Sequence, residues 1–119
     1  MFINFKKLVA SFRFAFSGIK TIFKEEQPFR IMLYIAALVT AAMFYFNLSL
    51  TQKAVLFMII TLVLTLEVVN SIVEKFLDFI HPNIDGRIKI IKDMLAGIVL
   101  IASIASVIIG VLIFWPLIF

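Results

Sequence analysis

The sequence contains no cysteine and a single histidine, His81. Without cysteine the chain can form no disulfide, no iron–sulfur cluster and no thiolate zinc site. One histidine also excludes a cluster of histidine ligands within one chain. Any metal site built from this chain therefore has to use carboxylates, which favour hard cations such as Mg²⁺.

Charged residues are scarce, and apolar residues take their place. Only 15% of the 119 residues are charged, 64% are apolar, and the mean hydropathy is +1.18. A soluble domain of this length leaves a large share of its surface exposed and could not hide so much apolar area. The composition predicts an integral membrane protein with one domain over residues 1–119. It excludes a soluble enzyme, a disordered tail and a disulfide-stapled secreted domain.

Residues 3–25 have the pattern of an amphipathic helix. Apolar residues recur three or four positions apart, and the basic residues Lys6, Arg13, Lys20 and Lys24 share the other face. A helix with this division lies flat in the membrane interface. Arg13 interrupts the apolar stretch, so the segment is not a signal peptide.

Three apolar segments follow, and we expect each to cross the bilayer as a helix. Their predicted bounds are about 30–50, 54–80 and 88–116, with a polar turn over 47–52 and a loop over 83–86. Pro28 suits the first turn of the first span, and Pro82 ends the second helix. The predicted fold is all-α and membrane-integral, with three transmembrane helices and an N-terminal interfacial helix.

The distribution of basic residues predicts the orientation. Six lie up to residue 30, and one lies between the first two spans. Four lie in the second loop and in the helix ends beside it, and none lies beyond residue 92. The positive-inside rule then places the N-terminus and the connection between the second and third spans in the cytoplasm, and the C-terminus outside. The net charge of +4 fits contact with anionic lipid. The charges are too few and too segregated for a nucleic-acid partner.

A polar stripe marks the second span. Glu67, Asn70, Glu74 and Asp78 are spaced three, four and four residues apart, which keeps them within about 80° on one helix face. Glu67 lies thirteen residues past Ala54, or about 20 Å into the membrane from its outer side, and therefore in the inner leaflet. A carboxylate facing lipid there costs several kcal/mol, so it faces a helix, a cavity or a substrate. A desolvated carboxylate is suited to act as a general base, and helix packing is the alternative role.

Further candidates lie where the spans meet the cytoplasmic interface. Glu26 and Glu74 stand at the mouths of two spans and could together hold Mg²⁺. Lys92 begins the third span, where it contacts either a phosphate or a lipid headgroup. Phe14 lies on the wet face of the first helix, either stacked on a ring or simply exposed. The sequence has neither GxxxxGK[ST] nor GxGxxG, so a nucleotide site would be of another kind.

Three stretches carry a resemblance to a known family. Residues 67–78 read EVVNSIVEKFLD, residues 92–97 read KDMLAG, and an N-terminal pattern runs from Ser11 through Glu26 to Arg30. The chain is similar in these stretches to the prokaryotic diacylglycerol kinase family, which consists of small membrane-integral lipid kinases. It resembles the Gram-positive branch, which phosphorylates undecaprenol, over residues 11–116.

The resemblance implies a multi-pass protein of the bacterial cytoplasmic membrane, a homotrimer that uses ATP and Mg²⁺ to phosphorylate a lipid hydroxyl at the cytoplasmic face. It implies Glu67 as the general base, with Glu26 and Glu74 as metal ligands. The residues implied near the nucleotide are Lys7, Phe14, Glu26, Glu74, Asn83, Asp85, Lys92 and Asp93. Those implied near the lipid are Phe29, Arg30, Glu67, Asn70 and Ala96.

The chain departs from the family pattern at several positions. Met32 replaces a histidine of the branch, Asn83 and Asp85 replace a glutamate and a histidine, and Ile88 and Ile91 replace small residues. The rival interpretations are a non-catalytic membrane scaffold and an ion or proton conduit along the acidic stripe. No ionisable group continues the stripe into the outer half of a span, which disfavours the conduit. Undecaprenol is the preferred substrate and diacylglycerol the next.

Overall fold

The computed structural model describes residues 2–83 and 85–119, and this part of the chain folds into four helices without a strand. They are α1 (Phe5–Glu25), α2 (Gln27–Tyr45), α3 (Leu50–Ile80) and α4 (Gly86–Ile118). The helices α2, α3 and α4 are long and apolar enough to cross a membrane. The predicted fold class, all-α with three membrane helices and a further N-terminal helix, is confirmed.

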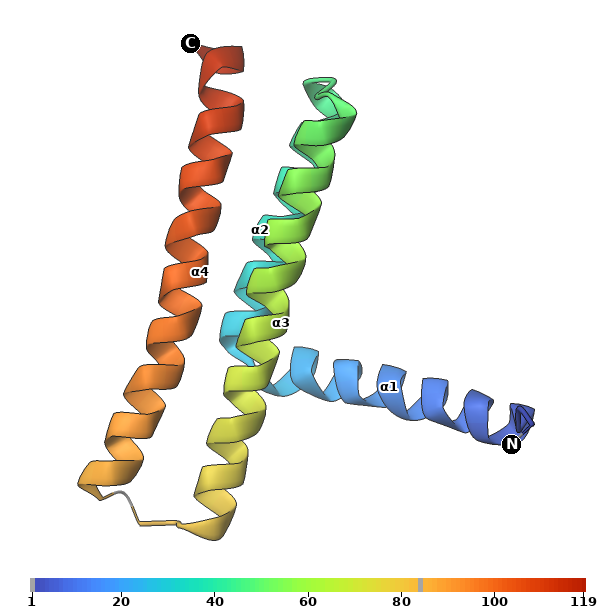
Figure 1. Cartoon of the computed structure of the whole chain (residues 1–119), viewed down its shortest axis with the longest axis vertical. Helices are drawn as coiled ribbons and strands as arrows, with labels where there is room; N and C mark the ends of the chain where they lie inside the picture. Colours follow the sequence, from blue (N-terminus) through green and yellow to red (C-terminus); the bar gives the residue numbers. More distant parts are fainter. Residues whose placement is uncertain (1, 84) are drawn as a thin grey trace.

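The helix α3 is the centre of the arrangement. It packs against both α2 and α4, whereas α1 contacts α2. Figure 1 shows α2, α3 and α4 running side by side, with α1 leaving them nearly at a right angle. The helices α3 and α4 both continue beyond the level of α1 before the loop that joins them.

The helix α1 buries none of its residues against the rest of the chain. Its aromatic side chains, such as Phe5, Phe12 and Phe16, are exposed in the isolated subunit. An amphipathic helix of this kind buries its apolar face among lipid headgroups and acyl chains instead. Only Glu26 separates α1 from α2, so the chain turns sharply from the membrane surface into the first span.

The second span starts earlier than its predicted residue 54. Ser49 Oγ accepts a hydrogen bond from the Gln52 backbone N–H at 3.1 Å, and Gln52 Oε1 accepts one from the Ser49 N–H at 3.0 Å. This capping box starts α3 at Leu50, so half of the predicted polar turn is helical. Asn47 completes the turn with a φ of 52°, which asparagine tolerates better than most residues.

The third span also starts earlier, at Gly86 rather than 88. Asp85 Oδ1 accepts hydrogen bonds from the backbone N–H groups of Arg87 at 2.9 Å and Ile88 at 3.0 Å, which caps the helix. These bonds, chiefly the one from Ile88, hold the pKa of Asp85 below its usual value. At its other end α4 runs through Pro116 to Ile118.

The interior of the subunit has two different ends. An apolar cluster of Met43, Leu48 and Leu56 packs near the turn that joins α2 to α3. The other half of α3 buries polar side chains instead, namely those of Glu67, Asn70 and Ser71. The candidate site therefore lies in that half of α3.

Candidate functional site

The polar stripe of α3 runs from the interior of the subunit to its surface. Glu67 is 5% exposed and Asn70 is 8% exposed, whereas Glu74 is half-buried and Asp78 is exposed. The stripe therefore connects a site within the membrane span to the water at the end of α3.

Asn70 lacks a hydrogen-bond partner for its side-chain oxygen. Among the described residues, its buried Oδ1 accepts no hydrogen bond. Buried polar atoms are nearly always paired, and leaving one unpaired costs about 1–3 kcal/mol. The oxygen lies one turn from the Glu67 side chain and is free to accept a hydrogen bond from a bound molecule.

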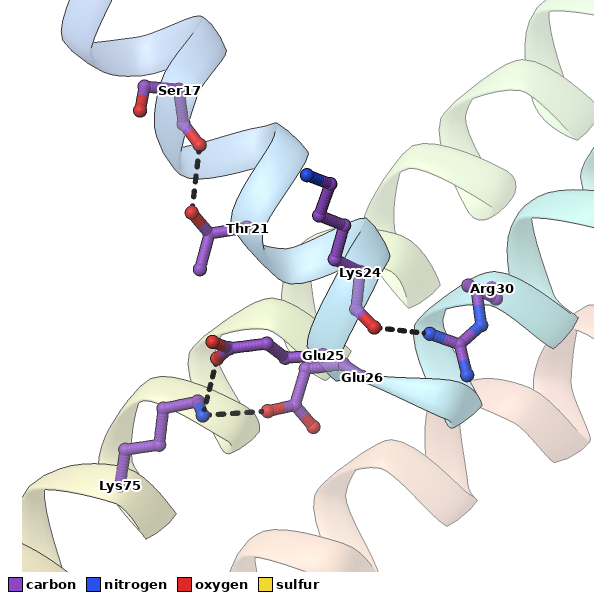
Figure 2. A network of polar contacts seen from close by, with 7 residues as sticks. All are labelled: Ser17, Thr21, Lys24, Glu25, Glu26, Arg30 and Lys75. Atoms are coloured by element: carbon purple, nitrogen blue, oxygen red, sulfur yellow. Dashed lines mark hydrogen bonds and ion pairs between the residues drawn. The ribbon is translucent and has the colours of Figure 1, made fainter.

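Glu26 reaches the stripe from the junction of α1 and α2. It occupies the N-cap position of α2, but its side chain makes no capping hydrogen bond. Its Oε1 instead lies 3.3 Å from Lys75 Nζ, and Glu25 Oε2 lies 3.0 Å from the same ammonium. Figure 2 shows both carboxylates turned toward Lys75 on α3.

The structure brings Glu26, Glu67 and Glu74 together. The charges of Glu74 and Glu26 both act on the Glu67 carboxylate. Within residues 2–83 and 85–119 no three acidic or histidine side chains are arranged to hold a metal ion by themselves. Two carboxylates nevertheless fit Mg²⁺, which commonly binds one or two protein carboxylates and completes its shell with water and phosphate oxygens.

Lys92 and Asp93 at the start of α4 are both engaged in ion pairs. Lys92 Nζ lies 2.6 Å from Asp78 Oδ1, which ties α4 to the exposed end of the stripe. Asp93 Oδ2 lies 2.8 Å from Lys89 Nζ. Lys92 is thus placed beside the acidic stripe, whereas Asp93 pairs within its own helix.

Asn83 and Asp85 lie in the loop between α3 and α4, beyond the end of the stripe. Asp85 caps α4, and its Oδ2 lies 3.5 Å from His81 Nε2. The backbone oxygen of Asn83 is hydrogen-bonded to His81 Nδ1. In this structure both residues organise the loop, and their predicted nucleotide contacts stay predictions.

The residues predicted beside the lipid have varied surroundings. Phe29 is buried within the subunit, and Ala96 is exposed on α4. Arg30 Nη1 donates hydrogen bonds to the backbone oxygens of Phe23 at 3.0 Å and Lys24 at 2.7 Å. These two carbonyls belong to the last turn of α1, so Arg30 helps to fix the angle between α1 and α2. Figure 2 shows the bond to the Lys24 carbonyl.

Lys7 and Phe14 are far from the acids within one subunit. They precede Glu26 by nineteen and twelve residues, which corresponds to about 28 and 18 Å along a helix. The helix α1 points away from the bundle over this length (Figure 1). The structure of one chain therefore does not bring these two predicted nucleotide contacts to the site.

Sequence reasoning missed Lys75, which it counted only as a charge for the orientation. It also missed Ser71, whose side chain is 4% exposed. The pairing of Lys75 with Glu25 joins residues 50 positions apart, so no local pattern indicates it. The position of Lys75 next to Glu74 was the one available signal.

An apolar groove leads from the acids into the membrane. It has a volume of about 630 Å³ and lies between α2, α3 and α4. Gln27 and Pro28 line one end, next to Glu26, and Leu64 lines it one turn from Glu67. Val39 and Phe114 line its far end. A largely apolar groove of this size is typical of sites for small molecules.

Comparison with known proteins identifies the family. Residues 13–114 match the family described as prokaryotic diacylglycerol kinase. The chain belongs to the prokaryotic diacylglycerol kinase family. This confirms the resemblance seen in the sequence. Together with the three apolar helices, it makes the chain a bacterial membrane protein.

Two relatives of this kinase-family chain illustrate its range. The chain is 36% identical to a diacylglycerol kinase from Synechocystis sp. (strain ATCC 27184 / PCC 6803 / Kazusa) over 104 residues, and this match covers 87% of the chain. The match covers 59% of that longer relative. The chain is also 32% identical over 106 residues to an undecaprenol kinase from Bacillus subtilis (strain 168), covering 89% of the chain and 86% of the relative.

Proposed function

We propose that this family member is a lipid kinase, which transfers the γ-phosphoryl group of ATP to the hydroxyl of a membrane lipid. The observation that carries the proposal is the buried Glu67 carboxylate in a membrane span, with Glu26 and Glu74 near it toward the exposed end of α3. The names of the two relatives, both kinases of membrane lipids, support the same activity.

In the proposed reaction the lipid oxygen attacks the γ-phosphorus in line. The new O–P bond forms as the bond to the bridging oxygen of the β-phosphate breaks, and ADP leaves. Glu67 takes the hydroxyl proton, and the unpaired Oδ1 of Asn70 lies one turn away on the same helix face. Phosphoryl transfer depends chiefly on such positioning and on neutralising charge.

Charge neutralisation is proposed for two groups of the site. A bound Mg²⁺ supplies positive charge at the phosphates, and Glu26 and Glu74 would hold it. Lys92, which is paired with Asp78 in the structure, supplies a further positive charge. The carboxylates fit this role because they flank Glu67 on the side that faces water.

The apolar groove is the proposed place for the hydrocarbon chain of the lipid. Its polar end adjoins Glu26 and comes within a turn of Glu67, so a chain in the groove would carry a hydroxyl at the level of the base. We propose undecaprenol as the preferred substrate and diacylglycerol as the second. One of the two relatives is named an undecaprenol kinase and the other a diacylglycerol kinase, so each substrate corresponds to one relative.

A shared site between subunits is proposed to account for Lys7 and Phe14. Because α1 carries them away from the acids of their own chain, they would approach the acids of a neighbour in a homotrimer. Coexpression of Lys7→Gln and Glu67→Gln subunits should restore activity above that of either variant alone, since some sites would combine intact parts. Activity no higher than the two variants separately would contradict the shared site.

The proposed kinase activity is tested directly with purified protein, labelled ATP and a panel of lipid alcohols in mixed micelles. We expect the label in an organic-soluble phosphate product, with transfer abolished by EDTA and restored by Mg²⁺. Chromatography of the product identifies the lipid. Absence of labelled lipid across undecaprenol, shorter polyprenols and diacylglycerol would contradict the proposal.

A further inference from the structure

Lys75 connects the interfacial helix to the acidic end of α3. Its ammonium lies 3.0 Å from Glu25 Oε2 and 3.3 Å from Glu26 Oε1, and the two acids come from the junction of α1 and α2 (Figure 2). It is the neighbour of Glu74 in the chain. Lys75 therefore contacts one proposed metal ligand and is adjacent in sequence to the other.

The charges around Lys75 explain why a cation lies there. Glu26 and Glu74 each repel Glu67, and we call these three acids the acidic cluster. Within the described residues, Lys75 is the cation that forms an ion pair with Glu26. The lysine side chain is 56% exposed, whereas that of Glu26 is 19% exposed. The ammonium can thus withdraw toward water, while the Glu26 carboxylate stays in the cluster.

Glu25 gives Lys75 a second partner that is free of the proposed metal site. Its carboxylate is 54% exposed and contacts the ammonium separately from that of Glu26 (Figure 2). The hydrogen bond from Lys75 Nζ to Glu25 Oε2 does not depend on the position of the Glu26 carboxylate. This bond alone can therefore hold the end of α1 to α3.

We propose that Lys75 is a positioning residue that holds the Glu26 carboxylate while no divalent cation is bound and releases it to the cation. The inference rests on the proposed function, because it requires a metal at Glu26 and Glu74. In the exchange, the contact between Lys75 Nζ and Glu26 Oε1 breaks and a metal–carboxylate contact forms. No proton or electron moves, and Lys75 stays charged and paired with Glu25.

The test measures Mn²⁺ binding to the full chain in nanodiscs, without nucleotide, by the electron paramagnetic resonance of free Mn²⁺. Removing the competing ammonium in Lys75→Gln should tighten Mn²⁺ binding about three- to ten-fold, since a unit charge acts strongly over a few ångströms near a protein surface. Lys75→Arg should restore the affinity of the parent. Glu25→Gln should weaken binding, because Lys75 then has Glu26 as its remaining partner.

The matched control is Lys53→Gln, which removes the same charge near the opposite end of α3, 22 residues or about 33 Å along the helix from Lys75. It should change the Mn²⁺ affinity less than about two-fold, because charges several Debye lengths away are screened. In a Glu26→Gln background, Lys75→Gln should have no further effect on the affinity. This double-variant comparison separates competition for Glu26 from a general change in net charge.

The outcomes distinguish this inference from the proposed function. Unchanged or weaker Mn²⁺ binding in folded Lys75→Gln, with normal Glu26-dependent binding in the parent, overturns the role of Lys75 and leaves the metal site intact. Absence of Mn²⁺ binding that depends on Glu26 and Glu74 in the parent overturns the metal site and the role of Lys75 together. Circular dichroism checks folding, and Glu25→Gln tests the competition with Lys75 unaltered.

Discussion

At the scale of single residues, the environment of α3 changes from buried to exposed within about three turns, between Glu67 and Asp78. The same helix face thus carries one carboxylate that is shielded from water and others that are in contact with water. A base for a lipid hydroxyl and ligands for a hydrated cation require these different surroundings. Glu67 and Glu74 are two turns apart and can serve both needs.

Glu67→Gln is the first test at this scale. The amide keeps the shape and hydrogen-bonding size of the side chain and removes the base, so turnover at saturating ATP and lipid should fall about 10²–10⁴-fold. The oligomer and nucleotide binding should persist. Ser71→Ala, a change at a buried neighbour, controls for altered packing. Activity of Glu67→Gln within a few-fold of the parent would favour a packing role for the stripe.

Glu26→Gln and Glu74→Gln test the metal ligands. Each removes one of the two carboxylates proposed to hold Mg²⁺, so the Mg²⁺ concentration for half-maximal activity should rise about ten-fold or more, as for loss of a strong polar contact. A titration of activity against Mg²⁺ measures it. Asp78→Asn removes a carboxylate from the same helix and should not produce this shift. Unaltered Mg²⁺ dependence in both variants would refute the shared metal site.

The buried acid was predictable from the sequence, but its neighbours were less so. The spacing of Glu67 and Asn70 places them on one face of a membrane helix, and the cost of a lipid-facing charge predicts that they turn inward. The ion pairs of Lys75 and Lys92 depend on how α1 and α4 approach α3. That approach is a matter of tertiary packing, on which spacing along one helix carries no information.

At the scale of elements, α3 and α4 each begin at an N-cap residue that the sequence analysis assigned to a polar loop. Ser49 and Gln52 form the S-x-x-Q spacing of a capping box, and Asp85 precedes α4 as an N-cap. Both signals are present in the sequence. The polarity of residues 47–52 and 83–86 favoured longer loops, so the predicted spans began late.

The cap at Asp85 predicts a pH dependence of stability. Backbone hydrogen bonds, chiefly from Ile88, hold the pKa of Asp85 below its unfolded value of about 3.9, and His81 and Arg87 act in the same direction. The stabilisation is therefore present above that value and is lost as the pH falls through the lowered pKa. Between pH 5 and pH 3 the melting temperature of the parent should fall more than that of Asp85→Asn.

The amide variant is a matched control because asparagine can cap the helix but does not titrate. Asp85→Ala should lower the melting temperature at pH 7 as well, since it removes the cap altogether. Circular dichroism in detergent micelles measures all three proteins. Identical pH profiles for the parent and Asp85→Asn would contradict the role of the Asp85 charge.

At the scale of the whole molecule, the orientation predicted from the basic residues can be tested by labelling. The natural absence of cysteine gives a background without native thiols. Thr51→Cys at the start of α3 and Asn83→Cys in the loop before α4 both place the thiol at exposed positions. An impermeant thiol reagent should label Cys at 51 in intact cells and Cys at 83 only after permeabilisation. Labelling of both from one side would contradict the three-span topology.

The assembly is the part that one sequence predicts least. Composition and run length determine three spans and an interfacial helix, because each is a property of one segment in its solvent. The direction of α1 relative to the bundle depends on Arg30 and on the single residue between α1 and α2. Because α1 points away from the bundle, Lys7 and Phe14 can contact a nucleotide only at the site of a neighbouring subunit.

The sharp junction of α1 with α2 also determines how the protein adapts to hydrophobic thickness. The 19 residues of α2 span about 28 Å, close to the hydrocarbon core of a typical bilayer. A helix that floats at one interface anchors that end of the span, so mismatch with a thicker or thinner bilayer is taken up at the opposite end, around Asn47 and Trp115. The depth of Glu67 is therefore set relative to the leaflet in which α1 lies. The alignment of Glu67 with lipid hydroxyls in that leaflet should not change with the thickness of the opposite leaflet.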